Sequence, residues 1–203
     1  MQTDKITSIR TWLGTGSINI FGLPMSGKDT VGTRLAATLG AQFLSSGDIL
    51  RANNISIINT GVLAPTDQFQ QLILPHFSRP EYADKPFVLS SVGRWSGEEN
   101  AVLEALEQAS HPLRAVLLLD ISENDVWARW ESVKILADRH NRSDDQERAI
   151  FQTRLNEFYD KTAPVLTHYQ QLGLLVHVPA NATRDQVFTS VLEKLYNFTL
   201  SSS

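Results

Sequence analysis

One short segment near the N-terminus constrains the fold more than any other feature of the sequence. The apolar run at residues 17–21 leads directly into Gly22-Leu-Pro-Met-Ser-Gly27-Lys28, and a helical pattern follows. A strand, a loop with the spacing G-x-x-x-x-G-K and a helix provide the context in which backbone N–H groups turn inward around phosphate oxygens. The helix N-terminus adds partial positive charge, and Lys28 can reach the β- and γ-phosphates of a nucleotide. The pattern therefore predicts a phosphate-binding P-loop.

The residues after the lysine raise the question of a metal ion. The hydroxyl group comes one place late, because Asp29 separates Lys28 from Thr30. A carboxylate beside a triphosphate is repulsive unless a cation lies between them, so Asp29 and Thr30 are candidate ligands of Mg²⁺. Asp29 can equally be an outward-facing residue of the first helical turn, favoured by the helix dipole. The predicted ATP-binding residues of the loop are Gly22, Pro24, Met25, Ser26, Gly27, Lys28, Asp29 and Thr30.

Five short apolar runs predict strands that are covered on both faces: residues 17–21, 41–45, 87–90, 115–121 and 174–178. Helical patterns separate these runs. One ends at Gly40, and another forms an apolar stripe over residues 151–169 that Pro164 is expected to kink. The alternation predicts an α/β protein with a three-layer P-loop NTPase fold and a five-stranded parallel sheet. Ligands of such sheets bind beyond the carboxyl ends of the strands.

Composition limits the other classes of protein. With 203 residues, we expect one domain over residues 1–203, with its core at about 17–198. The net charge of −4 gives no reason to expect a nucleic-acid partner. The absence of cysteine excludes disulfides and thiolate metal sites, and fits a reducing compartment. We find no membrane-spanning run and no signal peptide in residues 1–16, so we expect a cytoplasmic monomer without a membrane partner.

Several motifs beyond the loop resemble the nucleoside monophosphate kinases of the adenylate kinase family. The displaced hydroxyl, G-K-x-T, is the form seen in that family. Residues 43–51, F-L-S-S-G-D-I-L-R, look like its acceptor-binding segment. The resemblance implies that Ser46 lies near the acceptor base and that Arg51 holds the acceptor phosphate. Gly61-Val-Leu63 is similar to the next piece of that region, so Leu63 is also expected to contact the acceptor. The resemblance covers roughly residues 17–198.

The later motifs resemble the donor side and the lid of the same family. Arg129 follows the fourth strand, where the family carries an arginine that stacks on the donor adenine. Arg142-Ser-Asp-Asp and Arg154-Leu look like the R-x-D-D and R-L elements that close over the phosphates. The short stretch before Arg142 implies a short lid at about 131–145 without a zinc-binding insertion, with Arg139 as a further candidate contact. The resemblance also implies a small acceptor-binding insertion at about 46–78.

One segment departs from the family pattern. After the third strand, Asp-Gly-hydrophobic-Pro-Arg is replaced by Ser90-Ser-Val-Gly-Arg94-Trp95. The arginine is kept, but Ser90 replaces the aspartate that orders the magnesium waters, which leaves the mode of metal binding open. Four residues after Arg94, where adenylate kinases place a base-reading glutamine, stands Glu98. A carboxylate only accepts hydrogen bonds, so Glu98 suits guanine N1–H and N2–H₂, or a single adenine N6–H. Alternatively, Glu98 is simply an acidic residue in the first turn of a helix at 97–110.

The implied reaction is ATP-dependent conversion of a nucleoside monophosphate to the diphosphate, with Mg²⁺ and a base that the sequence leaves open. Such transfer needs positioning and charge neutralisation, because the attacking monophosphate oxygen is already anionic. Arg51 and Arg94 would orient the acceptor, and the phosphate-closing arginines would neutralise the transferring group. The predicted catalytic residues are Lys28, Arg94, Arg142 and Arg154, and the predicted acceptor-binding residues are Ser46, Arg51, Leu63, Arg94 and Glu98.

Two other functions fit the sequence. One is a P-loop kinase that phosphorylates a hydroxyl group of a sugar or an acid, with Asp48 or Glu98 as the base. The other is a nucleotide-binding module without catalysis, suggested by the altered segment that begins at Ser90. The retained arginines argue against the module, because phosphate-binding arginines without a catalytic role would place like charges close together with no compensating benefit.

Overall fold

Five parallel strands form one sheet, as the sequence predicts. The structure, a computed structural model, describes residues 2–136 and 147–201. Each strand pairs in parallel with its neighbours, in the order β2-β3-β1-β4-β5. The strands are β1 (Ser17–Gly22), β2 (Gln42–Ser45), β3 (Phe87–Ser90), β4 (Leu113–Asp120) and β5 (Leu175–Pro179). Each lies close to its predicted range, and the P-loop NTPase fold class is confirmed.

The central strand β1 carries the P-loop at its carboxyl end. All six residues of β1 are buried, because β3 and β4 flank the strand and helices cover both of its faces. In the pairing with β3, Ser17 lies opposite Phe87 and Ile20 lies opposite Ser90. The carboxyl ends of β1 and β3 therefore meet at one edge of the sheet. Ligands of open α/β sheets bind at this edge.

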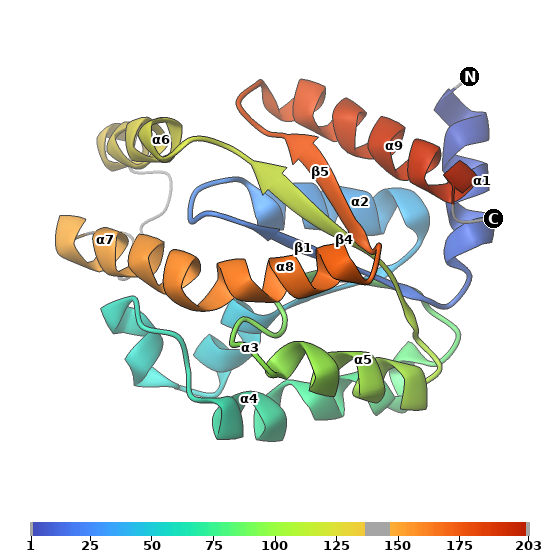
Figure 1. Cartoon of the computed structure of the whole chain (residues 1–203), viewed down its shortest axis with the longest axis horizontal. Helices are drawn as coiled ribbons and strands as arrows, with labels where there is room; N and C mark the ends of the chain where they lie inside the picture. The colour runs from blue at the N-terminus through green and yellow to red at the C-terminus, as the bar shows by residue number, and fades with distance from the viewer. Residues whose placement is uncertain (1, 137–146, 202–203) are drawn as a thin grey trace.

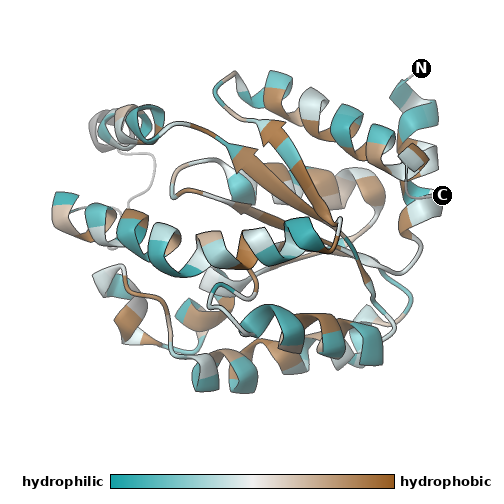
Figure 2. Cartoon of the chain, viewed as in Figure 1, coloured by the Kyte–Doolittle hydropathy of each residue, from teal (hydrophilic) through white to brown (hydrophobic). Residues whose placement is uncertain are grey.

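Helices cover both faces of the sheet, so the molecule has three layers (Figure 1). On one face, α1 (Gln2–Leu13), α2 (Lys28–Leu39) and α9 (Arg184–Ser201) join the strands in one hydrophobic cluster. A second cluster covers the other face with α3 (Ser46–Ala52), α4 (Thr66–Leu72), α5 (Glu98–Gln108) and α8 (Ala163–Gln171). Figure 2 shows mostly hydrophobic strands between helices in which hydrophilic and hydrophobic residues alternate. Burial of both faces explains why the strands read as continuous apolar runs.

The first helix lies outside the core that the sequence analysis predicted. The predicted core begins at about residue 17, yet α1 packs against α9 and buries Ile9 and Leu13 completely or nearly so. Trp12 of α1 meets Phe198 of α9 edge-on, with ring centroids 5.9 Å apart. The spacing of Ile6, Ile9 and Leu13 is the signal that could have revealed this helix.

The long apolar stripe forms two helices joined by a wider turn. Helix α7 (Arg148–Glu157) leads into a π-helical turn (Phe158–Thr162), and α8 follows. Pro164 has no N–H group, so it cannot donate to a carbonyl of the preceding turn in the usual α-helical pattern. The predicted interruption therefore lies immediately before Pro164, and it takes the form of a π-turn. The turn matters for the site because Phe158 and Thr162 face the cavity described below.

The segment between β2 and β3 contains the predicted acceptor-binding insertion. It holds α3, α4 and three 3₁₀ helices, at Ser56–Thr60, Leu74–Ser78 and Pro80–Tyr82. Helix α6 (Glu123–Leu136) follows β4 and packs against α7 through Val126, Trp130 and Phe151. Most of the predicted lid, with Arg139 and Arg142, lies outside the described residues. Within the described part of the chain, no helix is both long and apolar enough to cross a membrane.

We expect Gly32→Ala to lower the free energy of unfolding by about 1 kcal/mol. A Cβ at Gly32 would lie 2.4 Å from Cε2 of Phe43, which packs against the core between α2 and β2. Overpacking costs about 1–3 kcal/mol, which exceeds the ~1 kcal/mol that alanine gains over glycine in a helix. Urea denaturation measures the change. Thr33→Ala, at an exposed position of the same helix, is the control, and a Gly32→Ala protein at least as stable as this control would contradict the prediction.

Candidate active site

A cavity lies where the carboxyl ends of β1, β2 and β3 meet. Its walls come from the P-loop, the start of α3, the strap at residues 61–63, the loop after β3 and the α7–π-turn segment. Four cationic side chains from different parts of the chain line this cavity: Lys28, Arg51, Arg94 and Arg154. A polar cavity with this excess of positive charge is suited to phosphate groups.

The P-loop has the geometry that its sequence pattern predicts. Gly22 ends β1 with φ 152°, and a Cβ there would lie 2.7 Å from Oγ of Ser26 and 3.0 Å from the carbonyl oxygen of Leu119. Only glycine therefore lets the loop turn so close to β4. Lys28 begins α2, and its Nζ donates to the carbonyl oxygens of Gly22 and Leu23, both at 2.9 Å. The ammonium group is thus held against the loop that it is expected to serve.

The two candidate metal ligands do not line the same cavity. Asp29 lines the first cavity, and its Oδ1 accepts a 2.7 Å hydrogen bond from Oγ of Ser90. Thr30 is exposed and lines a second cavity, because successive residues of a helix point in different directions. The carboxylate and hydroxyl oxygens of Asp29 and Ser90 are hard ligands of the kind that Mg²⁺ takes. Among the described residues, no cluster of three or more His, Asp or Glu side chains could hold a metal alone.

The predicted acceptor residues Ser46, Arg51 and Leu63 all line the first cavity. Oγ of Ser46 donates to the carbonyl oxygen of Ser91 at 2.7 Å, which joins α3 to the loop after β3. Arg51 forms an ion pair with Asp48 within α3. Leu63 is buried, and its backbone N–H donates to Oε2 of Glu157 at 2.9 Å. The structure therefore brings these three residues together from two separate segments.

Arg94 lies among several other charges. Burial, together with the positive charge of Arg154, lowers the pKa of Arg94 to about 10, although Glu98 and Glu157 act in the opposite direction. A guanidinium with this pKa still carries its full charge at pH 7. A cation that is costly to desolvate and stands beside like charges gains most from an incoming anion. Arg94 therefore has the electrostatic environment of a phosphate-binding group.

Glu98 is bound to the loop that carries Arg94 and does not line the first cavity. The side chain is buried, only 3% exposed, and it is absent from the lining of the cavity. Its Oε2 accepts hydrogen bonds from the backbone N–H groups of Arg94, at 2.8 Å, and Trp95, at 3.0 Å. The carboxylate thus fixes the loop that carries Arg94. The base-reading role expected from sequence finds no support in this geometry.

Asn19 is a site-building residue that the sequence analysis missed. It lies fully buried in β1, and its Nδ2 donates to the carbonyl oxygen of Val92 at 2.7 Å. In return, the backbone N–H of Val92 donates to Oδ1 of Asn19 at 3.3 Å. This two-point contact ties the central strand to the loop after β3. A lone amide within the apolar run at 17–21 was the available signal, because buried polar groups need partners.

A second cavity of about 530 Å³ lies on the other side of the P-loop. Met25 and Gly27 line both cavities, and Ser26, Thr30 and Arg129 line the second one. The guanidinium of Arg129 donates to the carbonyl oxygens of Met25 and Ser26, both at 3.2 Å, and of Ala180 at 2.6 Å. Burial lowers the pKa of Arg129, with the nearby Asp125 acting in the opposite direction. Arg129 thus joins the P-loop to the loop after β5.

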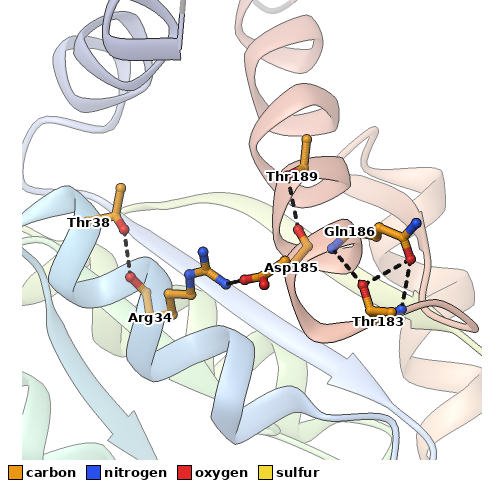
Figure 3. A network of polar contacts seen from close by, with 6 residues as sticks. All are labelled: Arg34, Thr38, Thr183, Asp185, Gln186 and Thr189. Atoms are coloured by element: carbon orange, nitrogen blue, oxygen red, sulfur yellow. Dashed lines mark hydrogen bonds and ion pairs between the residues drawn. The ribbon is translucent and has the colours of Figure 1, made fainter.

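Beside the second cavity, side chains of α2 and α9 contact each other (Figure 3). Arg34 reaches across to Asp185 with an N–O distance of 2.6 Å, and its guanidinium lies 4.1 Å from the ring centroid of Phe188. At the start of α9, Oγ1 of Thr183 donates a hydrogen bond to Oε1 of Gln186 and accepts one from the backbone N–H of Gln186. An apolar ring, a planar cation and backbone carbonyls suit a flat heterocycle better than a phosphate.

The site therefore has a phosphate-binding loop with a cationic cavity on one side and a second cavity on the other. These features are typical of P-loop nucleotide phosphotransferases. Comparison with known proteins narrows this class, since the family model described as adenylate kinase matches residues 20–174. Adenylate kinase of Thermus thermophilus is 30% identical over 190 residues, covering 88% of this chain and 97% of its own length. Adenylate kinase of Synechococcus sp. strain CC9902 is 28% identical over 184 residues, covering 86% and 95%.

The chain belongs to the adenylate kinase family. It is an ATP-dependent phosphotransferase of the nucleoside monophosphate kinase type, as the sequence motifs indicated. The two alternatives, a kinase of hydroxyl groups and a module without catalysis, are not favoured. The roles of the individual site residues stay predictions, and Arg142 lies outside the described residues.

We expect Asn19→Leu to lower the free energy of unfolding by about 2 kcal/mol. The substitution keeps a side chain of similar size but leaves the N–H and carbonyl of Val92 without their partner inside the protein. Each buried polar group left in this state costs about 1–3 kcal/mol. Chemical denaturation measures the loss, with Asn197→Leu on the exposed side of α9 as the control. Equal stability of the two variants would show that Asn19 does not hold the loop.

Proposed function

We propose that phosphoryl transfer takes place in the first cavity, between ATP and an acceptor monophosphate. The observation that carries this proposal is the convergence of Lys28, Arg51, Arg94 and Arg154 on one cavity beside the P-loop. Lys28 and the amides of residues 22–28 bind the donor phosphates, while Arg51 and Arg94 orient the acceptor phosphate. Arg154 neutralises charge on the group in transit, joined by Arg142 according to the family resemblance. No general base is required, because the attacking oxygen is an anion already.

We propose that the second cavity binds the adenine of ATP. Arg129 and Arg34 supply planar cations there, and Phe188 supplies an aromatic wall. Met25 and Gly27 line both cavities, so one nucleotide can have its base in the second and its terminal phosphates in the first. This arrangement leaves the strap at residues 61–63, with Leu63, and Ser46 for the acceptor.

We propose AMP as the acceptor. The relatives that cover most of this chain are adenylate kinases. Glu98, the carboxylate that could have recognised the donors of guanine, has Oε2 engaged by two backbone N–H groups instead. Among the described residues that line the first cavity, the carboxylate is Asp29, which lies in the phosphate-binding loop region. These observations favour a base without an N1–H donor.

We propose that Mg²⁺ accompanies ATP and is held by Asp29, directly or through water, with Ser90 as its hydrogen-bonding partner. The ion would supply charge neutralisation for the phosphates. Thr30 stays a sequence-based candidate, although it is exposed on the side of the second cavity. A cytoplasmic location and a monomeric state also stay predictions; the absence of cysteine from the sequence fits a reducing compartment.

An acceptor panel tests the proposed function. With Mg-ATP, we expect ADP formation with AMP to exceed that with GMP, CMP, UMP and dTMP by at least about tenfold. Lys28→Ala should lower turnover by at least about 10²-fold, because it removes a cation from the transferring phosphates. Lys194→Ala, at an exposed position of α9, is the matched control and should turn over normally. A preferred acceptor other than AMP would contradict the choice of base, and near-normal turnover by Lys28→Ala would contradict the site.

We expect Asp29→Asn to weaken metal binding while the fold is kept. The amide oxygen can still accept the hydrogen bond from Ser90, so only the charge is removed. The concentration of free Mg²⁺ that gives half-maximal turnover should rise by about tenfold or more, since Mg²⁺ binds through anionic oxygens. Manganese binding in the presence of ADP, followed by electron paramagnetic resonance, gives a readout independent of turnover. Asp84→Asn, in the exposed loop before β3, is the control. The role of Asp29 is refuted if both variants show the metal affinity of the unmodified protein.

A further inference from the structure

Three segments that carry predicted site residues meet at the first cavity. They are the strap, taken from here on as residues 61–64 so that it includes Ala64, the loop after β3 with Arg94 and Trp95, and the α7–π-turn segment. Gly61 lies so close to α7 that a Cβ there would be 2.7 Å from the carbonyl oxygen of Ile150 and 3.0 Å from Cγ of Arg154. The strap is therefore packed directly against the helix that contributes an arginine to the cavity.

Trp95 connects two of these segments through its side chain. Its indole Nε1 donates to the carbonyl oxygen of Ala64, in the strap, at 3.0 Å. Its backbone N–H is fixed at the same time by Oε2 of Glu98. Trp95 is partly exposed and does not line the cavity, so it is not placed to stack on a bound base. Arg94, which precedes Trp95 in the chain, and Leu63, which precedes its partner Ala64, do line the cavity.

Lys161 and Glu157 complete the connection from the α7–π-turn segment. Nζ of Lys161 lies 4.0 Å from the ring centroid of Trp95 and 2.6 Å from Oε2 of Glu157. The same Oε2 accepts the backbone N–H of Leu63 at 2.9 Å. The side chains of Lys161 and Glu157 are only 22% and 14% exposed. Such a pair is screened less by solvent than a surface ion pair.

These contacts form a closed circuit around the acceptor side of the cavity. It runs from Trp95 to Ala64, along the backbone to Leu63, then through Glu157 and Lys161 back to the Trp95 ring. The circuit fixes Leu63 relative to the loop that carries Arg94. Glu157 also raises the pKa of Arg94, so its charge acts on the same guanidinium.

We propose that Trp95 is a positioning residue for the acceptor monophosphate. It acts through Ala64 and through the Lys161–Glu157 pair, which together hold the strap and the Arg94 loop at the spacing that the acceptor needs. The inference rests on the proposed function of the first cavity as the acceptor site. It goes further, because it assigns control of acceptor affinity to a side chain that the acceptor does not touch.

Trp95→Phe tests the proposal. Phenylalanine keeps an aromatic ring beneath Lys161 but cannot donate to the carbonyl of Ala64. We expect the KM for AMP to rise about 3- to 10-fold, which matches the loss of one hydrogen bond. The KM for ATP and kcat should stay within about twofold, because the second cavity and the P-loop do not contact the circuit directly. Trp12→Phe, in α1 at the far side of the sheet, removes the same N–H group and should leave all constants unchanged.

Lys161→Met provides an independent test from the other side of the circuit. It keeps an unbranched side chain, one heavy atom shorter, but removes the charge that faces Trp95 and Glu157, and should raise the KM for AMP about 2- to 10-fold. The double variant should raise this KM by less than the product of the two single effects, because both break one circuit. Lys194→Met on α9 is the control. If Trp95→Phe does not fold, Lys161→Met alone decides.

The outcomes separate this inference from the proposed function. The positioning role is overturned if the unmodified protein phosphorylates AMP while both folded variants keep its KM for AMP. It is also overturned if the KM values for ATP and AMP rise together, which would indicate a general structural role. If the unmodified protein phosphorylates no nucleoside monophosphate, the proposed function fails and the inference fails with it.

Discussion

The burial of β1 between two strands and two helical layers is the constraint on which the rest of the structure depends. A central strand of this kind can end only at the edge of the sheet, and its chain must leave through a tight turn at Gly22. The turn places the N-terminus of α2 at that edge, where Nζ of Lys28 donates hydrogen bonds to two carbonyl oxygens of the loop. Each further wall of the two cavities is then positioned relative to this loop. Ser46 and Asn19 bind the loop after β3 from either side, and Arg129 binds the P-loop from α6.

Charge is the second organising principle of the site. Arg94 and Arg154 lie close enough to lower the pKa of Arg94, and Glu98 and Glu157 raise this pKa again. Neither carboxylate lines the cavity, so the charged side chains of its wall are mainly cationic. The same carboxylates accept hydrogen bonds from the backbone N–H groups of Arg94, Trp95 and Leu63. The residues that balance the charge of Arg94 therefore also fix the geometry of the loops.

Much of the fold and of the phosphate site could be predicted from the sequence because both depend on local signals. Strands buried on both faces give apolar runs, and the P-loop needs glycines and a lysine at fixed spacing. Helix α1 was not predicted to be part of the core because its apolar positions are few. The predicted core began instead with the strand that precedes the P-loop. The place of Glu98 could not be predicted, because a carboxylate at the start of a helix can face solvent, a ligand or the preceding loop with equal local propensity. Asn19 was not recognised for a related reason: its partner, Val92, is set by tertiary packing.

The hydrogen bond between Ser90 and Asp29 has a consequence for how relatives of this chain are compared. The carboxylate that the family resemblance leads one to expect at the end of β3 is absent from position 90, yet an acidic oxygen lies 2.7 Å from the serine hydroxyl, supplied by the start of α2. The two positions are 61 residues apart in the chain but share one contact in space. Scoring each alignment column separately would count a lost acidic group, whereas in this chain a carboxylate of the adjoining element lies beside that position. Columns 29 and 90 are therefore best compared as a pair.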